Sequence, residues 1–236
     1  YLASDLATEL KLEILDSQGN LVRSYSSESQ GEREVLPAEA SMREWRLEAV
    51  GTPKLDSSAG AHRFSWDLSH AGPWDGDAER SGRNGPMVAP GEYQARLTVG
   101  DSINTVSFQT VTNPRVSKEG AISDTEIVEQ VEFTLKARDL LSTVRMAASR
   151  VTEALKSATG SEKDSLEEIK KDLITAPRRY SQPMLVDQVS YLYGNLDRAD
   201  QQPGQDAIVR YENLKSDVEE QLGKIDGLLG STGGGR

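Results

Sequence analysis

The stretch that decides the fold of this chain is Tyr93-Gln94-Ala95-Arg96-Leu97-Thr98-Val99, followed by Gly100-Asp101 and the run 103–111. Apolar and polar side chains alternate in both runs and Gly-Asp is a turn pair, so the stretch predicts a β-hairpin. Thr112-Asn113-Pro114-Arg115 then interrupts the strand, and beyond it apolar side chains recur at spacings of three and four. The sequence therefore predicts a β half and a helical half that meet near residue 115.

The β pattern extends towards the N-terminus. Leu10, Leu12 and Ile14 alternate with charged side chains and lead through the turn at 17–20 into the apolar run 21–25. This arrangement indicates a second hairpin, in which the two runs pair with each other.

Two further stretches complete the predicted sheets. His62-Arg63-Phe64-Ser65-Trp66-Asp67-Leu68 predicts a central core strand, because its apolar side chains share one face at period two. A strand is also expected at 45–50, whereas Ala71–Pro90 is rich in Gly, Pro and charge and is expected to be a long loop. About six to eight short strands in the first half favour an antiparallel immunoglobulin-like β-sandwich.

The second half is predicted to be helical. Ser123-Asp124-Thr125-Glu126 has the pattern of a capping box, and a helix is expected from there to about Ser157. Its apolar stripe consists of Phe133, Ala137, Leu140, Val144, Ala147, Val151 and Ala154.

Three more helices are expected after this one. Ser161 is placed as the cap of the first, Pro183 in the first turn of the second, and Pro203-Gly204 before the third. Their apolar stripes are Leu166, Ile169 and Leu173; Leu185, Val189, Leu192 and Leu196; and Tyr211, Leu214, Val218, Leu222, Ile225 and Leu229. The lengths favour an antiparallel bundle of three rods, the middle one broken at 177–183, with four rods as the alternative.

These patterns predict two domains and a tail. Residues 1–115 are expected to form the immunoglobulin-like β-sandwich and residues 116–230 the helical bundle. The Gly-rich end, 231–236, is expected to be a flexible tail. Each domain is long enough to bury a core of its own.

Composition excludes several classes of function. The 236 residues include 27 basic and 38 acidic side chains, a net charge of −11. This charge opposes nucleic-acid binding, which depends on clustered Lys and Arg. Membrane insertion is also excluded, because no apolar run reaches the length of about 18 residues that a membrane span needs. The chain has no cysteine and only two histidines, so thiol chemistry is excluded and histidine chemistry has few groups to use.

The loop 71–85 is the candidate metal site. It carries acidic side chains at alternate positions: Asp75, Asp77 and Glu79. Calcium prefers several oxygen ligands on a flexible, Gly-containing turn, so calcium is the cofactor that this pattern suggests. The EF-hand pattern is incomplete, since Arg80 and Pro86 occupy the positions of its glycine and glutamate. The alternative is a solvated loop in which arginines offset the acidic side chains.

Trp74, in the same loop, is the candidate ligand-binding residue. An exposed tryptophan can stack on a sugar or a protein group, and the alternative is burial of Trp74 under the loop. Trp45 and the pair Tyr191 and Tyr193 are further aromatic candidates; because the two tyrosines are two residues apart on a helix, one of them is expected in the bundle core. Trp66 is expected in the core of the β half.

No catalytic residue is predicted. Asp67, Ser69 and His70 lie near one another, yet the sequence shows neither the Gly-flanked elbow nor the oxyanion hole of a hydrolase. No pair of carboxylates stands out for glycoside hydrolysis among the 38 acidic residues. Asp67 is expected to be a turn partner.

Several stretches taken together carry a family resemblance: Tyr1-Leu2, Leu12–Arg23, Gly60–Leu68, Gly85–Val99, Asn113-Pro114-Arg115, Gln188–Gly194 and Ala199–Pro203. They resemble the C-terminal region of bacterial sortilin-like, BNR-repeat, glycosyl hydrolase-like β-propeller proteins, over nearly the whole chain. The β half is also similar to the immunoglobulin-like domain of the flagellar hook-capping protein, which shares Trp-Asp-Gly and Pro-Gly-Glu-Tyr with Trp74-Asp75-Gly76 and Pro90-Gly91-Glu92-Tyr93.

The resemblance implies an exported bacterial protein, periplasmic, surface-exposed or secreted, with a β-propeller upstream of Tyr1. The start of the chain within a predicted strand and without Met fits a part of such a longer protein. The expected function is a non-catalytic accessory region that supports or orients the propeller, its partner in the same polypeptide. The alternatives are a carbohydrate- or protein-binding module that uses the Trp74 loop and, third, a glycoside hydrolase.

Overall fold

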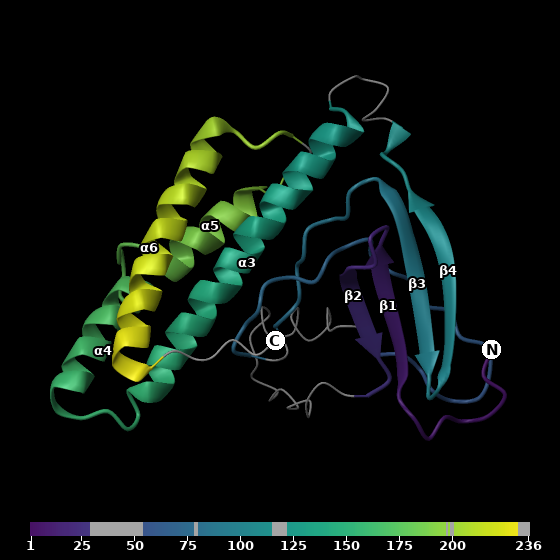
Figure 1. Cartoon of the computed structure of the whole chain (residues 1–236), viewed down its shortest axis with the longest axis horizontal. Helices are drawn as coiled ribbons and strands as arrows, with labels where there is room; N and C mark the ends of the chain where they lie inside the picture. Colours follow the sequence, from purple (N-terminus) through teal and green to yellow (C-terminus); the bar gives the residue numbers. More distant parts are fainter. Residues whose placement is uncertain (29–53, 78–79, 115–121, 197, 199–200, 231–236) are drawn as a thin grey trace. The chain divides into compact units, whose positions relative to one another are not determined.

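A computed structural model gives the fold of the chain (Figure 1). The residues that it describes are 1–28, 54–77, 80–114, 122–196, 198 and 201–230. They form a four-stranded antiparallel sheet followed by four helices, which confirms the predicted order of a β part and a helical part. Contacts divide the chain into a β unit, Tyr1–Gly72 with Asp77–Val128, and a helical unit, Pro73–Gly76 with Glu129–Arg236.

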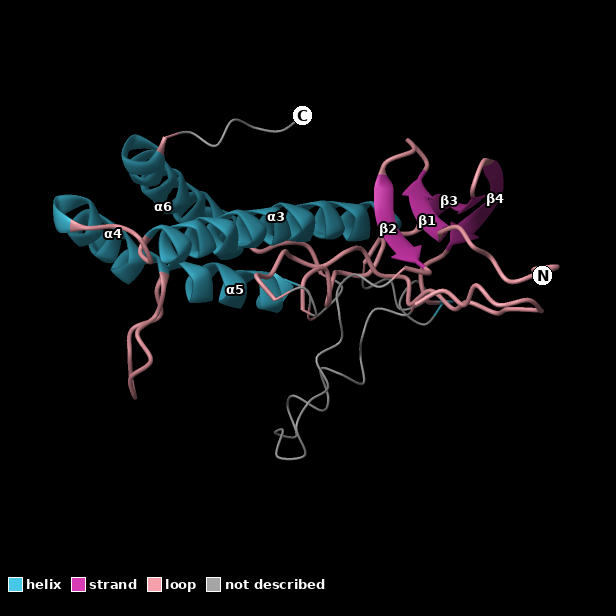
Figure 2. Cartoon of the chain, turned by 90° about the horizontal axis from the view of Figure 1, so that it is seen from below, coloured by secondary structure: helices cyan, strands magenta, loops and turns pink. Residues whose placement is uncertain are grey.

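The sheet of the β unit has the strand order β2-β1-β3-β4 (Figure 2). The strands are β1 (Leu10–Asp16), β2 (Leu21–Ser26), β3 (Gly91–Val99) and β4 (Ser102–Thr110). Both predicted hairpins are confirmed. The carboxylate of Asp16 accepts the backbone N–H groups of Gln18 and Asn20 at 2.9 and 2.8 Å in the first turn. Gly100 begins the second turn at φ +54°, which a type II′ turn requires at this position.

Aromatic side chains pack on the core face of the sheet. The ring of Trp66 lies 6.0 Å from the rings of Tyr93 and Phe108, and the ring of Phe64 lies 4.5 Å from that of Tyr25. Phe64 and Trp66 therefore face the core, as their spacing predicts. The buried apolar residues of this core are Leu10, Ile14, Val22, Tyr25, Leu55 and Tyr93.

The central strand predicted at 62–68 is wrong. This segment has no secondary structure in the described residues, and Leu68 is 40% exposed at φ +59°. Left-handed backbone at Leu68 ends the extended run, and the backbone N–H of Val88 donates to its carbonyl oxygen at 2.8 Å. The alternating pattern thus reports which face the side chains share, not pairing in a ladder.

The predicted sandwich stays a prediction in its finer features. The described residues contain one sheet, and the strand expected at 45–50 lies outside them, as does the tail 231–236. The loop expected at 71–90 is confirmed in its described residues, which contain no strand.

The helices are α3 (Asp124–Ala154), α4 (Gly160–Leu173), α5 (Leu185–Leu196) and α6 (Gln205–Leu229). The capping box of α3 is confirmed, because the Glu126 carboxylate accepts the Ser123 backbone N–H at 2.7 Å and the Glu126 N–H donates to the Ser123 hydroxyl at 3.3 Å. The hydrogen bond from the Ser123 backbone lowers the pKa of Glu126.

Two predicted helix starts are wrong. The cap of α4 is Thr159, without a side-chain hydrogen bond, and the helix begins at Gly160, one residue before Ser161. Pro183 precedes α5, whose first backbone bond runs from Gln188 to the Met184 carbonyl oxygen. The Met184 N–H is held by the Thr175 hydroxyl at 2.9 Å, which sets this start.

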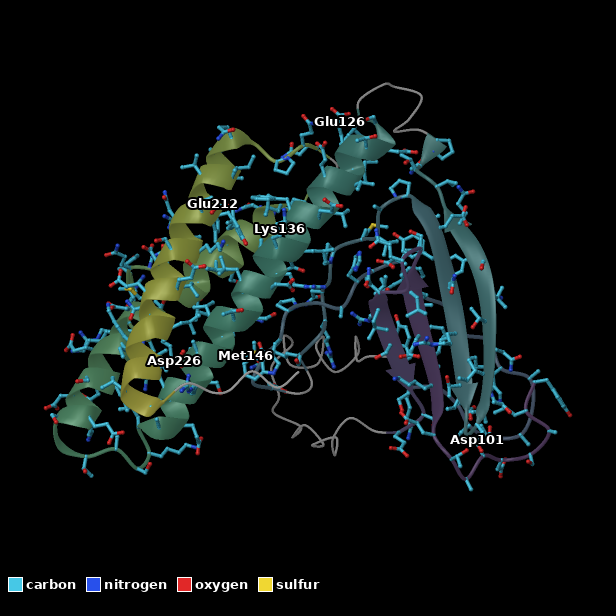
Figure 3. All side chains as sticks on the ribbon, viewed as in Figure 1. Asp101, Glu126, Lys136, Met146, Glu212 and Asp226 are labelled. Atoms are coloured by element: carbon cyan, nitrogen blue, oxygen red, sulfur yellow. The ribbon has the colours of Figure 1, made fainter. Side chains whose placement is uncertain are left out.

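The apolar stripes of all four helices meet in one core. Its side chains with no exposed surface are Ala137, Val144, Val151, Leu166, Leu173, Val189, Leu214 and Ile225. Phe133 packs on Tyr211 with 5.4 Å between ring centroids, and Arg150 pairs with Asp226 at 2.6 Å, so α3 and α6 run in the same direction (Figure 3). The Gln130 amide reaches the Leu196 carbonyl oxygen at 3.0 Å, so α5 ends beside the start of α3.

Val218→Ala tests the helical core. Val218 on α6 is 1% exposed, and its truncation should lower the free energy of unfolding by about 1–3 kcal/mol through lost burial and a new cavity. Val209→Ala makes the same change on the same helix where the side chain is 50% exposed, and should cost at most about 0.5 kcal/mol. Urea unfolding measures the loss of unfolding free energy in both variants. Equal losses would contradict the burial of Val218 in the helical core.

Glu13→Gln tests the charge cluster on the sheet. Burial acts to raise the pKa of Glu13, but hydrogen bonds and charge from Lys11 and Arg96, at 3.0 and 2.9 Å, lower it below the usual 4.5. A lowered pKa adds stability that is present above pH 4.5 and is lost as the pH falls through the folded-state value. Between about pH 7 and about pH 3, urea midpoints should fall less for Glu13→Gln than for the wild type. Glu92→Gln is the control at an exposed position of β3, and the fall of its urea midpoint between these pH values should equal that of the wild type.

Candidate functional site

The Trp74 loop, residues 71–85, is closed at its base by buried polar contacts in the β unit. The guanidinium of Arg23, 8% exposed, donates to the carbonyl oxygens of His70 and Gly82 at 2.9 and 2.6 Å. A Cβ at Gly72 would lie 1.7 Å from a facing carbonyl oxygen, so only glycine fits there. The base of the loop is therefore a defined structure.

Trp74 itself belongs to the helical unit, where its main chain is held on α3. Its backbone N–H donates to the Ser142 hydroxyl at 2.9 Å, and Arg145 donates to its carbonyl oxygen at 3.2 Å. Arg145 also lies 3.5 Å from the carboxylate of Asp75. The Trp74 side chain is half-buried, between the two predicted alternatives of a free platform and full burial.

The two described acidic side chains of the loop each pair with an arginine. Asp75 pairs with Arg145 as described, Asp77 pairs with Arg80 at 3.1 Å, and Glu79 lies outside the described residues. Within those residues no group of three or more His, Asp or Glu side chains is placed to hold a metal ion. The arginine pairs favour the predicted alternative in which basic groups offset the carboxylates.

The polar residues considered for catalysis are used in turns. Asp67 accepts the N–H and the hydroxyl of Ser69 at 3.1 and 2.7 Å, which confirms its predicted role as a turn partner. A ring nitrogen of His62 lies 2.7 Å from the Ser58 carbonyl oxygen, and the carbonyl of His70 accepts Arg23. These bonds hold the chain in its turns and leave the Ser69 hydroxyl donating to a carboxylate.

The aromatic candidates separate by exposure. Tyr193 on α5 is 7% exposed and fills the helical core, whereas Tyr191 is 75% exposed, so the predicted division of this pair is confirmed. Trp45 lies outside the described residues. Trp66 packs in the β core and donates its indole N–H to the Ser69 carbonyl oxygen at 3.1 Å.

The segment between α4 and α5, residues 177–183, is a candidate site that the sequence interpretation missed. We call it the Arg–Tyr loop; Figure 2 shows it extending away from the helices. Tyr180 is 90% exposed, and the guanidinium of Arg179 lies 5.2 Å from the centre of its ring. The Ser181 N–H and hydroxyl both donate to the Arg178 carbonyl oxygen, at 3.3 and 3.1 Å, and Tyr180 takes a left-handed φ of +63°.

A signal for this loop was present in the sequence. Two adjacent arginines and a tyrosine stand between two prolines in a chain of net charge −11. The sequence interpretation used Pro177 to end one helix and Pro183 to begin the next, and drew nothing from the side chains between them.

A shallow groove lies between α4 and α6. It has a volume of about 570 Å³ and is lined by residues that include Ser165, Asp172, Gly223, Gly227 and Leu228. A Cβ on either glycine would meet no atom within 4 Å, so the groove is open.

Of the described helices, none is long and apolar enough to cross a membrane.

Comparison of the chain with protein-family models, with curated proteins and with solved structures gives no match. The resemblance to propeller-associated regions therefore rests on the quoted stretches alone.

Calcium should leave thermal stability unchanged. Because Arg145 and Arg80 already pair with two of the three carboxylates, millimolar calcium and EDTA should give the same melting temperature. Binding at a hundredfold excess over Kd would instead add about 2.7 kcal/mol of stability. A rise with calcium that Asp77→Asn removes would restore the calcium interpretation.

Proposed function

We propose that the chain is a non-catalytic interaction region that supports or orients an upstream β-propeller of an exported bacterial protein. The propeller and the export come from the family resemblance. In this proposal the β unit serves as an immunoglobulin-like sandwich, and the helical unit as a bundle of three rods: α3, α4 with α5, and α6.

The Arg–Tyr loop is the observation that carries the interaction role. Tyr and Arg supply much of the binding energy at protein interfaces, because they combine large contact areas with directed hydrogen bonds. Tyr180 is almost fully exposed beside Arg179, in a chain whose net charge is −11. Such a loop fits a partner surface that offers carboxylates to the arginines and a pocket to the ring.

The second candidate is a binding module that uses the Trp74 loop. Its support is the half-buried indole on a main chain held by Ser142 and Arg145, which would present a ring in one orientation. Its ligand would be a sugar or a protein group that stacks on the ring.

Tyr180→Ala tests the proposed function. Titration of the chain with the separately produced propeller segment, followed by calorimetry, should show a loss of affinity of about thirtyfold, as for a hot-spot residue. Tyr191→Ala removes a comparably exposed ring from α5 and should leave the affinity unchanged.

Other outcomes would assign the function elsewhere. Glycan or protein binding that Trp74→Ala abolishes and Tyr180→Ala preserves would favour the second candidate. Turnover of aryl glycosides by the chain would overturn the non-catalytic role.

A further inference from the structure

The two edges of the sheet differ in how they are covered. The β2 edge is covered, because the backbone N–H groups of Leu55 and Ala71 donate to the carbonyl oxygens of Ser26 and Val22 at 3.0 and 3.1 Å. β4 is the other edge strand, and Figure 1 shows it outermost in the sheet. It pairs with β3 over its whole length, and no other strand among the described residues pairs with it.

Alternate residues of β4 direct their backbone groups away from β3. The two-residue turn makes Val99 and Ser102 a hydrogen-bonded pair, so the even-numbered residues of β4 bond to β3. The odd-numbered residues therefore present their N–H and C=O groups at the open edge: Ile103, Thr105, Ser107 and Gln109.

β4 lacks the devices by which edge strands avoid pairing. It contains no Pro and no Lys, and its register with β3 runs without a bulge. In fact no charged side chain occurs from Ser102 to Pro114, although Asp101 marks the turn before it (Figure 3). Val106 is 67% exposed near the middle of the strand.

We propose that β4 pairs antiparallel with β4 of a second copy of this chain, about a twofold axis at Val106. In this register Thr105 lies opposite Ser107 of the other copy, and Ile103 lies opposite Gln109. All the outward backbone groups then find partners, since the odd-numbered residues pair only with one another. The two Val106 side chains face each other in a non-hydrogen-bonded pair, where cross-strand side chains come closest.

The uncharged edge permits a second copy as the occupant. Two chains of net charge −11 repel each other overall, but the run from Ser102 to Pro114 brings no like charges face to face when two β4 strands approach. A twofold interface needs a surface complementary to itself, which this register provides. One strand pair buries less than a standard interface of about 1,600 Å², so dissociation in the micromolar range is expected. This inference is independent of the proposed function.

Cysteine crosslinking tests the register in the full chain, which has no cysteine of its own. Val106→Cys should form a disulfide-linked dimer under mild oxidation. Val111→Cys is the matched control, because Val111 is 74% exposed just beyond the strand and away from the axis. At about 100 µM chain, Val106→Cys should crosslink about tenfold faster, since pairing raises its effective concentration to the millimolar range.

Sedimentation equilibrium gives an independent readout. Val106→Lys places two ammonium groups on the axis and should weaken the dimer at least about tenfold, whereas Val111→Lys adds the same charge and should not. Circular dichroism confirms that both variants are folded. A wild-type chain that stays monomeric at about 100 µM, equal crosslinking of the two cysteine variants, or a dimer insensitive to Val106→Lys would each overturn the proposal.

Discussion

The helical unit depends on one apolar core, to which α3, α4, α5 and α6 all contribute buried side chains. Ala137, Val144 and Val151 recur along one face of α3 and have no exposed surface. A helix as short as α4, with 14 residues, is marginal in water by itself, so its stability comes from burying Leu166 and Leu173 in this shared core. Loss of the α3 stripe would therefore remove a large part of the core that all four helices share.

The β unit meets a different constraint, because one layer of sheet must cover its apolar face with irregular chain. The segment that contains Phe64 and Trp66 does so through aromatic contacts with Tyr25, Tyr93 and Phe108. Irregular backbone leaves carbonyl groups without ladder partners, and the buried guanidinium of Arg23 satisfies two of them at the base of the Trp74 loop. The β unit is thus held by apolar packing in its core and by polar contacts at the base of the Trp74 loop.

Two surfaces depart from the acidic character of the chain, and both proposals rest on them. The Arg–Tyr loop is basic and aromatic, and its exposed groups suit a partner of opposite charge. The β4 edge is uncharged, and its outward backbone groups, which pair with no strand among the described residues, suit another strand. They lie in different units and use different chemistry, so they can act separately.

Local pattern in the sequence determined the two hairpins, the capping box at Ser123 and the buried stripes of all four helices. These features depend on side chains a few residues apart, whose spacing the sequence states directly. It also determined that Phe64 and Trp66 face the core of the β unit, because period-two alternation places them on one face; Leu68, expected on the same face, is 40% exposed.

Tertiary structure alone decided the rest. Whether 62–68 joins a ladder depends on partners far along the chain, and the left-handed turn at Leu68 withdraws it from one. Whether the Asp75 carboxylate has a basic partner depended on Arg145, 70 positions further along the chain. The packing of Trp74 and Asp75 on α3 brings the two side chains together. Likewise, only the sheet order showed that β4 has an open edge while β2 is covered. Contacts between distant residues leave no periodic trace in the sequence, which is why spacing could not predict them.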